Sequence, residues 1–190
     1  MRVCSVLGSP RPQGNTARVL GWVEDELKKA GHEVLRVDVG RGQIRPCQEC
    51  YGCHANLEEP DCMVDDLAPN IFREWLKSDL ILLASPLFCW GVSAQLKALI
   101  DRAYCLIKPD GKKGYRSLLN GQRVALIMTA GDAIEDNLDR AVPPHRSFVE
   151  FFNGRDAGNL LIPFCTKPEE LGAAVEAQAR AFAHTLAGIS

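Results

Sequence analysis

The sequence predicts an α/β fold: an open, five-stranded parallel sheet with helices on both faces. Two observations lead to this prediction. Apolar segments of strand length alternate with amphipathic helical segments along the 190 residues. The third apolar segment, DLILLAS at 79–85, is apolar on both faces, as a central parallel strand should be. No internal repeat or linker interrupts the pattern, so we expect one domain over residues 1–190.

Five segments have the pattern of sheet strands, namely 2–7, 33–39, 79–85, 123–130 and 157–164. Helices are expected over 16–30, from about residue 66, over 93–104, over 144–153 and along a last stripe at Leu171, Val175, Ala179, Phe182 and Leu186. Residues 40–65 are expected to be irregular, and residues 105–121 are expected to form a polar connection that contains glycine.

Helix ends carry the expected signals. Gly31 follows the apolar stripe of the first helix and is a typical stop. Asp65 or Asp66 can cap the second helix, whose first turn tolerates Pro69. Gly154 ends the fourth helix. In such sheets ligands bind beyond the carboxyl ends of the strands, so the loops after the first, third and fourth strands are the candidates for a site.

Composition excludes several classes of function. A net charge of −2 argues against a nucleic-acid surface built on phosphate contacts. No stretch approaches the ~20 apolar residues needed to span a bilayer, and the first residues do not have the pattern of a signal peptide. We therefore expect a cytoplasmic protein with reduced thiols and no membrane or nucleic-acid partner.

The loop GSPRPQGNT, residues 8–16, lies between the first strand and the first helix. Helix N-termini attract anions, and here Arg11 adds a cation while Ser9, Asn15 and Thr16 add short donors. Neither dinucleotide nor nucleoside-triphosphate loop motifs are present, so a single terminal phosphate suits the loop. The alternative is that these polar side chains only cap the helix.

Two further loops indicate a planar ligand. Phe88 and Trp90 follow the third strand, where exposed aromatic rings are a platform for a flat ring system. The segment TAGD, residues 129–132, follows the fourth strand and can approach from the other side. A phosphate loop together with two loops for a heterocycle describes flavin mononucleotide (FMN).

These motifs resemble the NAD(P)H-dependent FMN reductase family, which has the flavodoxin-like fold. The resemblance is carried by GSPRPQGNT, by SPLFCWGVSAQLKALIDR at 85–102, by TAGD and by KPEEL at 167–171. It implies a three-layer sandwich with strand order 2-1-3-4-5, non-covalent FMN and a homodimer with the flavin near the interface. The implied FMN contacts are Ser9, Arg11, Gln13, Gly14, Asn15, Thr16, Pro86, Leu87, Phe88, Cys89, Trp90, Gly91, Thr129, Ala130, Gly131 and Asp132. The family often has tyrosine at the position of Phe88, followed directly by tryptophan and glycine, whereas Cys89 intervenes here.

A second cluster of chemistry lies in CQECYGCHANLEEPDC, which spaces its thiols as C-x2-C-x2-C-x8-C: Cys47, Cys50, Cys53 and Cys62. Thiolates converging in one short loop suit an iron–sulfur cluster or zinc. The segment resembles the cysteine motif of iron–sulfur flavoproteins, which implies a [4Fe–4S] cluster near FMN. Two alternatives remain, a metal-free loop near the flavin and a zinc site. His54 is taken as an exposed loop histidine, and the remaining cysteines, except Cys89, as small buried apolar residues.

The leading hypothesis is an FMN-dependent oxidoreductase. It takes hydride from NAD(P)H and passes electrons to a quinone, a nitro or azo compound, free flavin or a protein acceptor. Because the cofactor carries the chemistry, no protein acid or base is assigned. A second hypothesis is an iron–sulfur electron carrier that works between a ferredoxin-like partner and FMN. A third is a zinc-stabilised binding module.

Overall fold

A computed structural model describes residues 1–111 and 114–188. It contains a five-stranded parallel sheet with the order β2-β1-β3-β6-β7. In chain order, counting only the strands of this sheet, that is the expected order 2-1-3-4-5. The elements are β1 (Arg2–Leu7), α1 (Asn15–Lys29), β2 (Glu33–Asp38), η1 (Gly52–His54), α2 (Ala68–Lys77), β3 (Leu80–Pro86), α3 (Ala94–Arg102), η2 (Ala103–Leu106), β4 (Ile107–Pro109), β5 (Tyr115–Ser117), β6 (Arg123–Thr129), η4 (Leu138–Ala141), α4 (Val142–Phe151), β7 (Arg155–Ile162), η5 (Pro168–Glu170) and α5 (Ala173–Ala187).

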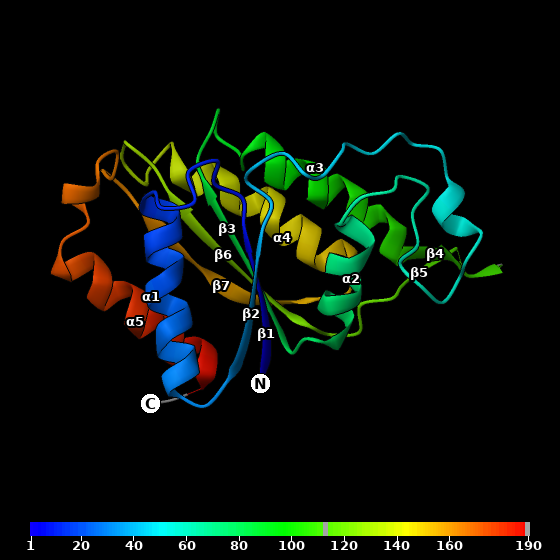
Figure 1. The fold of residues 1–190 in the computed structure, drawn as a ribbon, viewed down its shortest axis with the longest axis horizontal. Helices are drawn as coiled ribbons and strands as arrows, with labels where there is room; N and C mark the ends of the chain where they lie inside the picture. Colours follow the sequence, from blue (N-terminus) through cyan, green and yellow to red (C-terminus); the bar gives the residue numbers. More distant parts are fainter. Residues whose placement is uncertain (112–113, 189–190) are drawn as a thin grey trace.

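The sheet is covered on both faces, with α1 and α5 on one side and α2, α3 and α4 on the other (Figure 1). Each face has its own apolar core. Every residue of β3 is buried, which explains why this segment is apolar throughout. The chain leaves β1 for β2 and returns to β3 on its other side, so the switch in strand order lies between β1 and β3.

Two local predictions differ from the structure, and a third is close to it. The stretch 105–121 is not wholly irregular, because its described residues include the antiparallel pair β4 and β5. These strands have three residues each, too short for a periodic signal, and they are defined by their pairing. The helix α4 begins at Val142, before the expected 144, because prolines are accepted in a first helical turn. The helix α2 begins at Ala68, close to the expected start at about residue 66, and Asp66 accepts the Ala68 N–H through Oδ1 at 2.9 Å, as expected of a residue that caps the helix.

Within the described ranges, no helix is both long enough and apolar enough to cross a membrane.

Candidate functional site

The loop after β1 is a tight turn held by its own atoms. The Arg11 N–H donates to Ser9 Oγ at 3.2 Å, and the Gly14 N–H donates to the Arg11 carbonyl at 3.0 Å. A Cβ atom on Gly14 would lie 2.9 Å from Arg11 Cβ, so the turn leaves no room for a side chain there. Ser9 is buried, whereas Arg11 and Gln13 are exposed.

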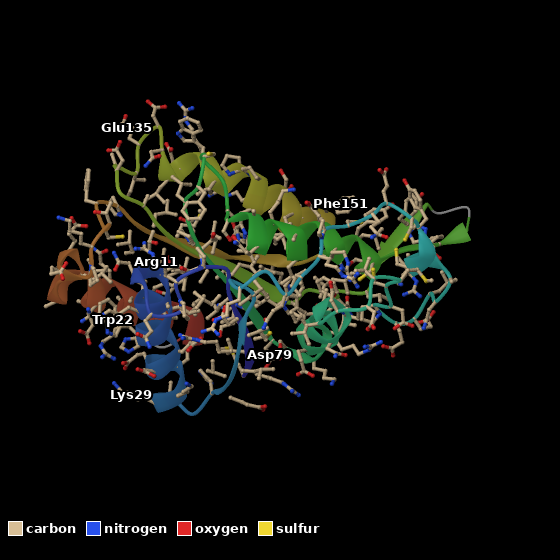
Figure 2. All side chains as sticks on the ribbon, turned by 45° about the horizontal axis from the view of Figure 1, so that its top comes forward. Arg11, Trp22, Lys29, Asp79, Glu135 and Phe151 are labelled. Atoms are coloured by element: carbon tan, nitrogen blue, oxygen red, sulfur yellow. The ribbon has the colours of Figure 1, made fainter. Side chains whose placement is uncertain are left out.

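The helix α1 begins without a side-chain cap. Gly14 is its N-cap residue, and no side chain of the described chain bonds to the free N–H groups of the first turn. Backbone N–H groups in this position have no partner within the helix and carry the positive end of its dipole. Arg11 lies at the same end of α1 (Figure 2). The alternative that the polar residues of this loop only cap the helix is therefore wrong, and the helix end is open to an anion.

Two residues expected to donate to a phosphate bond to protein atoms instead. The Asn15 side-chain amide donates to the carbonyls of Cys165 at 2.7 Å and Lys167 at 3.1 Å. The Thr16 hydroxyl is 2.7 Å from the Thr129 hydroxyl, and both residues are buried. These side chains tie the first loop to the loops after β6 and β7, so they position the site rather than face into it.

The loop after β3 is a two-residue hairpin. The Phe88 N–H donates to the Gly91 carbonyl at 2.9 Å, and the Gly91 N–H donates back at 3.0 Å. Cys89 and Trp90 at its tip both have left-handed backbones, with φ of 47° and 60°. Neither is glycine, and a left-handed residue costs roughly 1–2 kcal/mol. Phe88 and Trp90 are 49% and 58% exposed, so this strained turn presents aromatic rings to solvent.

The second and third loops meet as expected. The Leu87 N–H donates to the Thr129 carbonyl at 2.9 Å. Beyond this bond, a cavity of ≈ 340 Å³ is lined by Leu87, Cys89, Trp90, Ala130, Gly131, Asp132 and Asn137. A Cβ atom on Gly131 would lie 2.5 Å from Thr166 Cγ2, so a side chain at this position would require Thr166 to shift. Residues predicted from two separate strands thus share one cavity wall.

Two serines were missed by sequence analysis. The buried Ser93 hydroxyl donates to the Gly8 carbonyl at 2.6 Å, and it also accepts the N–H of Leu96 as the cap of α3. Ser85 Oγ accepts the Ser93 N–H at 2.8 Å. Together they fix the start of α3 against the first loop. A serine directly before an apolar helical stripe was the available signal.

The cysteine segment forms a second cavity, of ≈ 460 Å³. Its wall includes all four motif residues, Cys47, Cys50, Cys53 and Cys62, together with Cys105. All eight cysteines are unbonded thiols, as expected. In the described part of the chain, no three His, Cys, Asp or Glu side chains converge closely enough to hold a metal ion. Glu49 and Tyr51, on either side of Cys50, have left-handed backbones with φ of 52° and 55°.

A buried ion pair between Arg102 and Asp66 lies next to the residues that flank the cysteine segment, residues 47–62. The Arg102 guanidinium donates to both Asp66 carboxylate oxygens, at 2.8 and 3.2 Å, and to the carbonyls of Arg45 and Val64. Both side chains of the pair are almost fully buried. Burial raises the pKa of Asp66, but hydrogen bonds from Arg102, Ala68 and Arg45 outweigh it, so the pKa lies below its usual value. These bonds hold the residues on both sides of the cysteine segment against Arg102, the last residue of α3.

Two of the cysteines that line this cavity have raised pKa values. Burial raises the pKa of the Cys105 thiol to about 12 and also raises that of Cys53. His54 is not exposed as expected: it is half-buried among Tyr51, Tyr104 and Tyr115, with ring centroids 5.7–6.2 Å away. Its Nε2 atom has no hydrogen-bond partner among the described residues, and neither has Arg102 Nε.

The two cavities lie at opposite ends of α3. The hairpin 88–91 precedes this helix, whereas Asp101 and Arg102 at its end line the cysteine cavity. Nine helical residues span about 14 Å at ~1.5 Å per residue. In Figure 1 the segment 40–65 begins beside the loop after β1 and runs along the molecule to the end away from α1 and α5, where η1 and the β4–β5 pair lie. The cysteine cavity and the flavin-loop cavity share no lining residue, and the expected closeness of the cysteine segment to the flavin stays a prediction.

A family profile described as NADPH-dependent FMN reductase matches residues 1–143. The chain belongs to this family. It is 35% identical over 103 residues to an iron–sulfur flavoprotein of Methanocaldococcus jannaschii, a match covering 54% of this chain and 52% of that protein. An FMN-dependent NAD(P)H:quinone oxidoreductase of Pseudomonas aeruginosa is 28% identical, with 68% of each chain covered. The alignments with iron–sulfur flavoproteins span about half the length of those relatives.

Solved structures of the same fold cover nearly the whole chain. An NAD(P)H:quinone oxidoreductase from Methanothermobacter marburgensis superposes with a TM-score of 0.75 over 96% of this chain and 97% of that one, at 16% identity. At this identity the likeness shows the fold, which is flavodoxin-like as expected. The family match also confirms the resemblance inferred from GSPRPQGNT and the aromatic loop.

Proposed function

We propose that this FMN reductase family member binds FMN at the β1, β3 and β6 loops and acts as an NAD(P)H-dependent oxidoreductase. The observation that carries the proposal is the uncapped start of α1, with Arg11 beside it, at the switch point of the sheet. The backbone N–H groups of α1 and Arg11 hold the phosphate. The hairpin 88–91 and residues 130–132 hold the ring. When bound there, FMN would supply the redox chemistry, namely hydride acceptance from NAD(P)H and electron transfer to an acceptor.

The protein contributes orientation rather than acid–base chemistry. The strained hairpin aims Cys89 and Trp90 outward, while Asn15, Thr16 and Thr129 keep the loops in register. Acceptors that suit an exposed aromatic platform are flat molecules, such as quinones, nitro or azo compounds and free flavin; a protein acceptor is the remaining class.

We also propose a homodimer with the exposed Phe88 and Trp90 at its interface, to be checked by sedimentation velocity.

FMN titration of flavin-free protein tests the phosphate site. Arg11→Met should weaken FMN binding by tenfold or more, because a hydrogen bond to a charged group contributes roughly 1.5–3 kcal/mol. Arg18→Met is the matched control, because Arg18 is also exposed on this part of the chain but stacks on Trp22 at 5.3 Å. Equal affinities for both variants would remove Arg11 from the site.

A second function is favoured by the cysteine cavity. We propose that Cys47, Cys50, Cys53 and Cys62 hold a [4Fe–4S] cluster, so that the protein also transfers electrons singly. The donor set fits, because five soft thiols line one cavity and the buried Arg102, which also lines it, has an Nε donor without a partner among the described residues. Several relatives are named iron–sulfur flavoproteins. Because the thiols do not converge in this structure, cluster binding requires the segment to close around it.

Iron, zinc and sulfide analysis of anaerobically reconstituted protein tests the cluster. Each of the four cysteine-to-serine variants should lose iron and visible absorption together while retaining FMN. Cys89→Ser is the control, because Cys89 is exposed but lies outside the motif. Flavin-loaded protein without iron after reconstitution contradicts the proposal. One zinc per chain would instead support the zinc alternative.

A further inference from the structure

Lys108 is a fully buried cation. It lies on β4, and its side chain is 0% exposed. Its ammonium group donates to the Cys53 carbonyl at 2.8 Å, and this is its one hydrogen bond within residues 1–111 and 114–188. The other buried cation of this region, Arg102, has the Asp66 carboxylate beside it. Lys108 has no such ion pair among the described residues.

A buried charge without a counter-charge is unfavourable, and proteins rarely keep one. Burial lowers the pKa of Lys108, and the nearby thiols of Cys105 and Cys53 and the Asp61 carboxylate act in the opposite direction. Both thiols line the ≈ 460 Å³ cysteine cavity. The charges of Arg102 and Asp66 cancel each other, whereas the charge of Lys108 has no partner among the described residues. Lys108 therefore adds a positive charge beside the cysteine cavity, whose thiols become anionic when they ligate metal.

We propose that Lys108 is the buried counter-charge of the group held by the cysteine cavity and that it raises the reduction potential of that group. The inference rests on the cluster assignment proposed above. Lys108 acts as a positioning residue, through the Cys53 backbone and through its charge, and it is not a ligand. A cluster bound by four thiolates carries negative charge, and one-electron reduction adds one more. A nearby cation therefore stabilises the reduced form more than the oxidised form.

A redox titration of the iron-loaded protein, followed by cluster absorption or electron paramagnetic resonance, tests this role. Lys108→Met keeps the length of the side chain without its charge. It should shift the equilibrium towards the oxidised cluster by at least tenfold, which is a fall of 59 mV for a one-electron couple. Lys108→Arg should stay near the parent potential. Lys97→Met is the control, because Lys97 is exposed and paired with Asp101 on α3.

The unfolding midpoint of iron-free protein gives a second readout, independent of the cluster. If Lys108 lacks a counter-charge, iron-free Lys108→Met should be at least as stable as the parent, because an uncompensated buried charge has been removed. A variant that loses its cluster but keeps this stability supports the proposal. A variant whose iron-free form is less stable than both the parent and Lys97→Met shows a structural role and overturns it.

The outcomes separate the two proposals. A parent protein without iron overturns the cluster assignment and, with it, the role of Lys108. A parent with iron, and a Lys108→Met variant that holds its cluster at the parent potential, overturns the role of Lys108 alone.

Discussion

Replacing Asp66 with asparagine should strongly destabilise this protein. The Asp66 carboxylate accepts hydrogen bonds from two Arg102 nitrogens and from the N–H groups of Arg45 and Ala68. Asparagine keeps the shape but removes the charge and turns one acceptor into a donor that faces other donors. Arg102, which is 1% exposed, is then buried without compensation. Breaking a buried ion pair from one side costs about 3–5 kcal/mol.

Urea unfolding measures this loss. With a slope of about 2 kcal/mol per molar, the midpoint should fall by roughly 1.5–2.5 M. Asp136→Asn is the control, because Asp136 is exposed and pairs with Arg140 on the surface. Such pairs contribute only ~0.3–0.5 kcal/mol. Equal midpoints for the two variants would refute the reasoning. The double variant Asp66→Asn with Arg102→Met should lose less than the sum of the single losses, because both charges are then gone.

The same pair predicts a dependence on pH. Because the pKa of Asp66 lies below its usual value of 3.8 in the folded protein, its stabilising contribution is fully present above that pH. The contribution is lost as the pH falls through the folded pKa. The stability difference between the parent and Asp66→Asn should therefore be constant between neutral pH and about pH 5, and it should shrink in more acidic solution. A difference that shrinks near neutral pH would contradict this assignment.

Two further predictions concern the flavin loops. Asn15→Ala should lower the free energy of unfolding by about 1–3 kcal/mol, because it leaves the buried Cys165 carbonyl without its donor, and it should weaken FMN binding as well. Weakened FMN binding with an unchanged urea midpoint would show instead that Asn15 contacts the phosphate directly. FMN should quench tryptophan fluorescence, and Trp90→Phe should abolish most of that quenching. Trp22→Phe is the control, because Trp22 lies on α1 (Figure 2), and it should leave the quenching intact. Equal quenching in both variants would show that the hairpin does not border the flavin.

The arrangement of the loops could be predicted because it follows from few rules. Parallel strands joined by helices bring their carboxyl ends to one edge, whatever the details of packing. Hence Leu87 and Thr129, from separate loops, were expected to be neighbours, and they are hydrogen bonded. The β4–β5 pair escaped prediction because three-residue strands have no periodicity. The pair is defined by its own ladder and makes contacts far away in the sequence, such as the hydrogen bond from Arg116 to the Leu57 carbonyl.

The roles of single side chains were harder to predict, for a physical reason. A short polar residue in a glycine-rich loop is equally suited to bind a phosphate or a distant carbonyl, and the sequence does not say which one it meets. Asn15 meets a carbonyl 150 residues along the chain. Lys108 belongs to a stretch of polar sequence, yet it is buried and donates to the carbonyl of Cys53. Conversely, Cys105 is buried, as expected, but it also lines the cysteine cavity, which the sequence did not indicate. Burial, rather than residue type, decides whether such groups serve the fold or the site, and burial is a property of the folded chain.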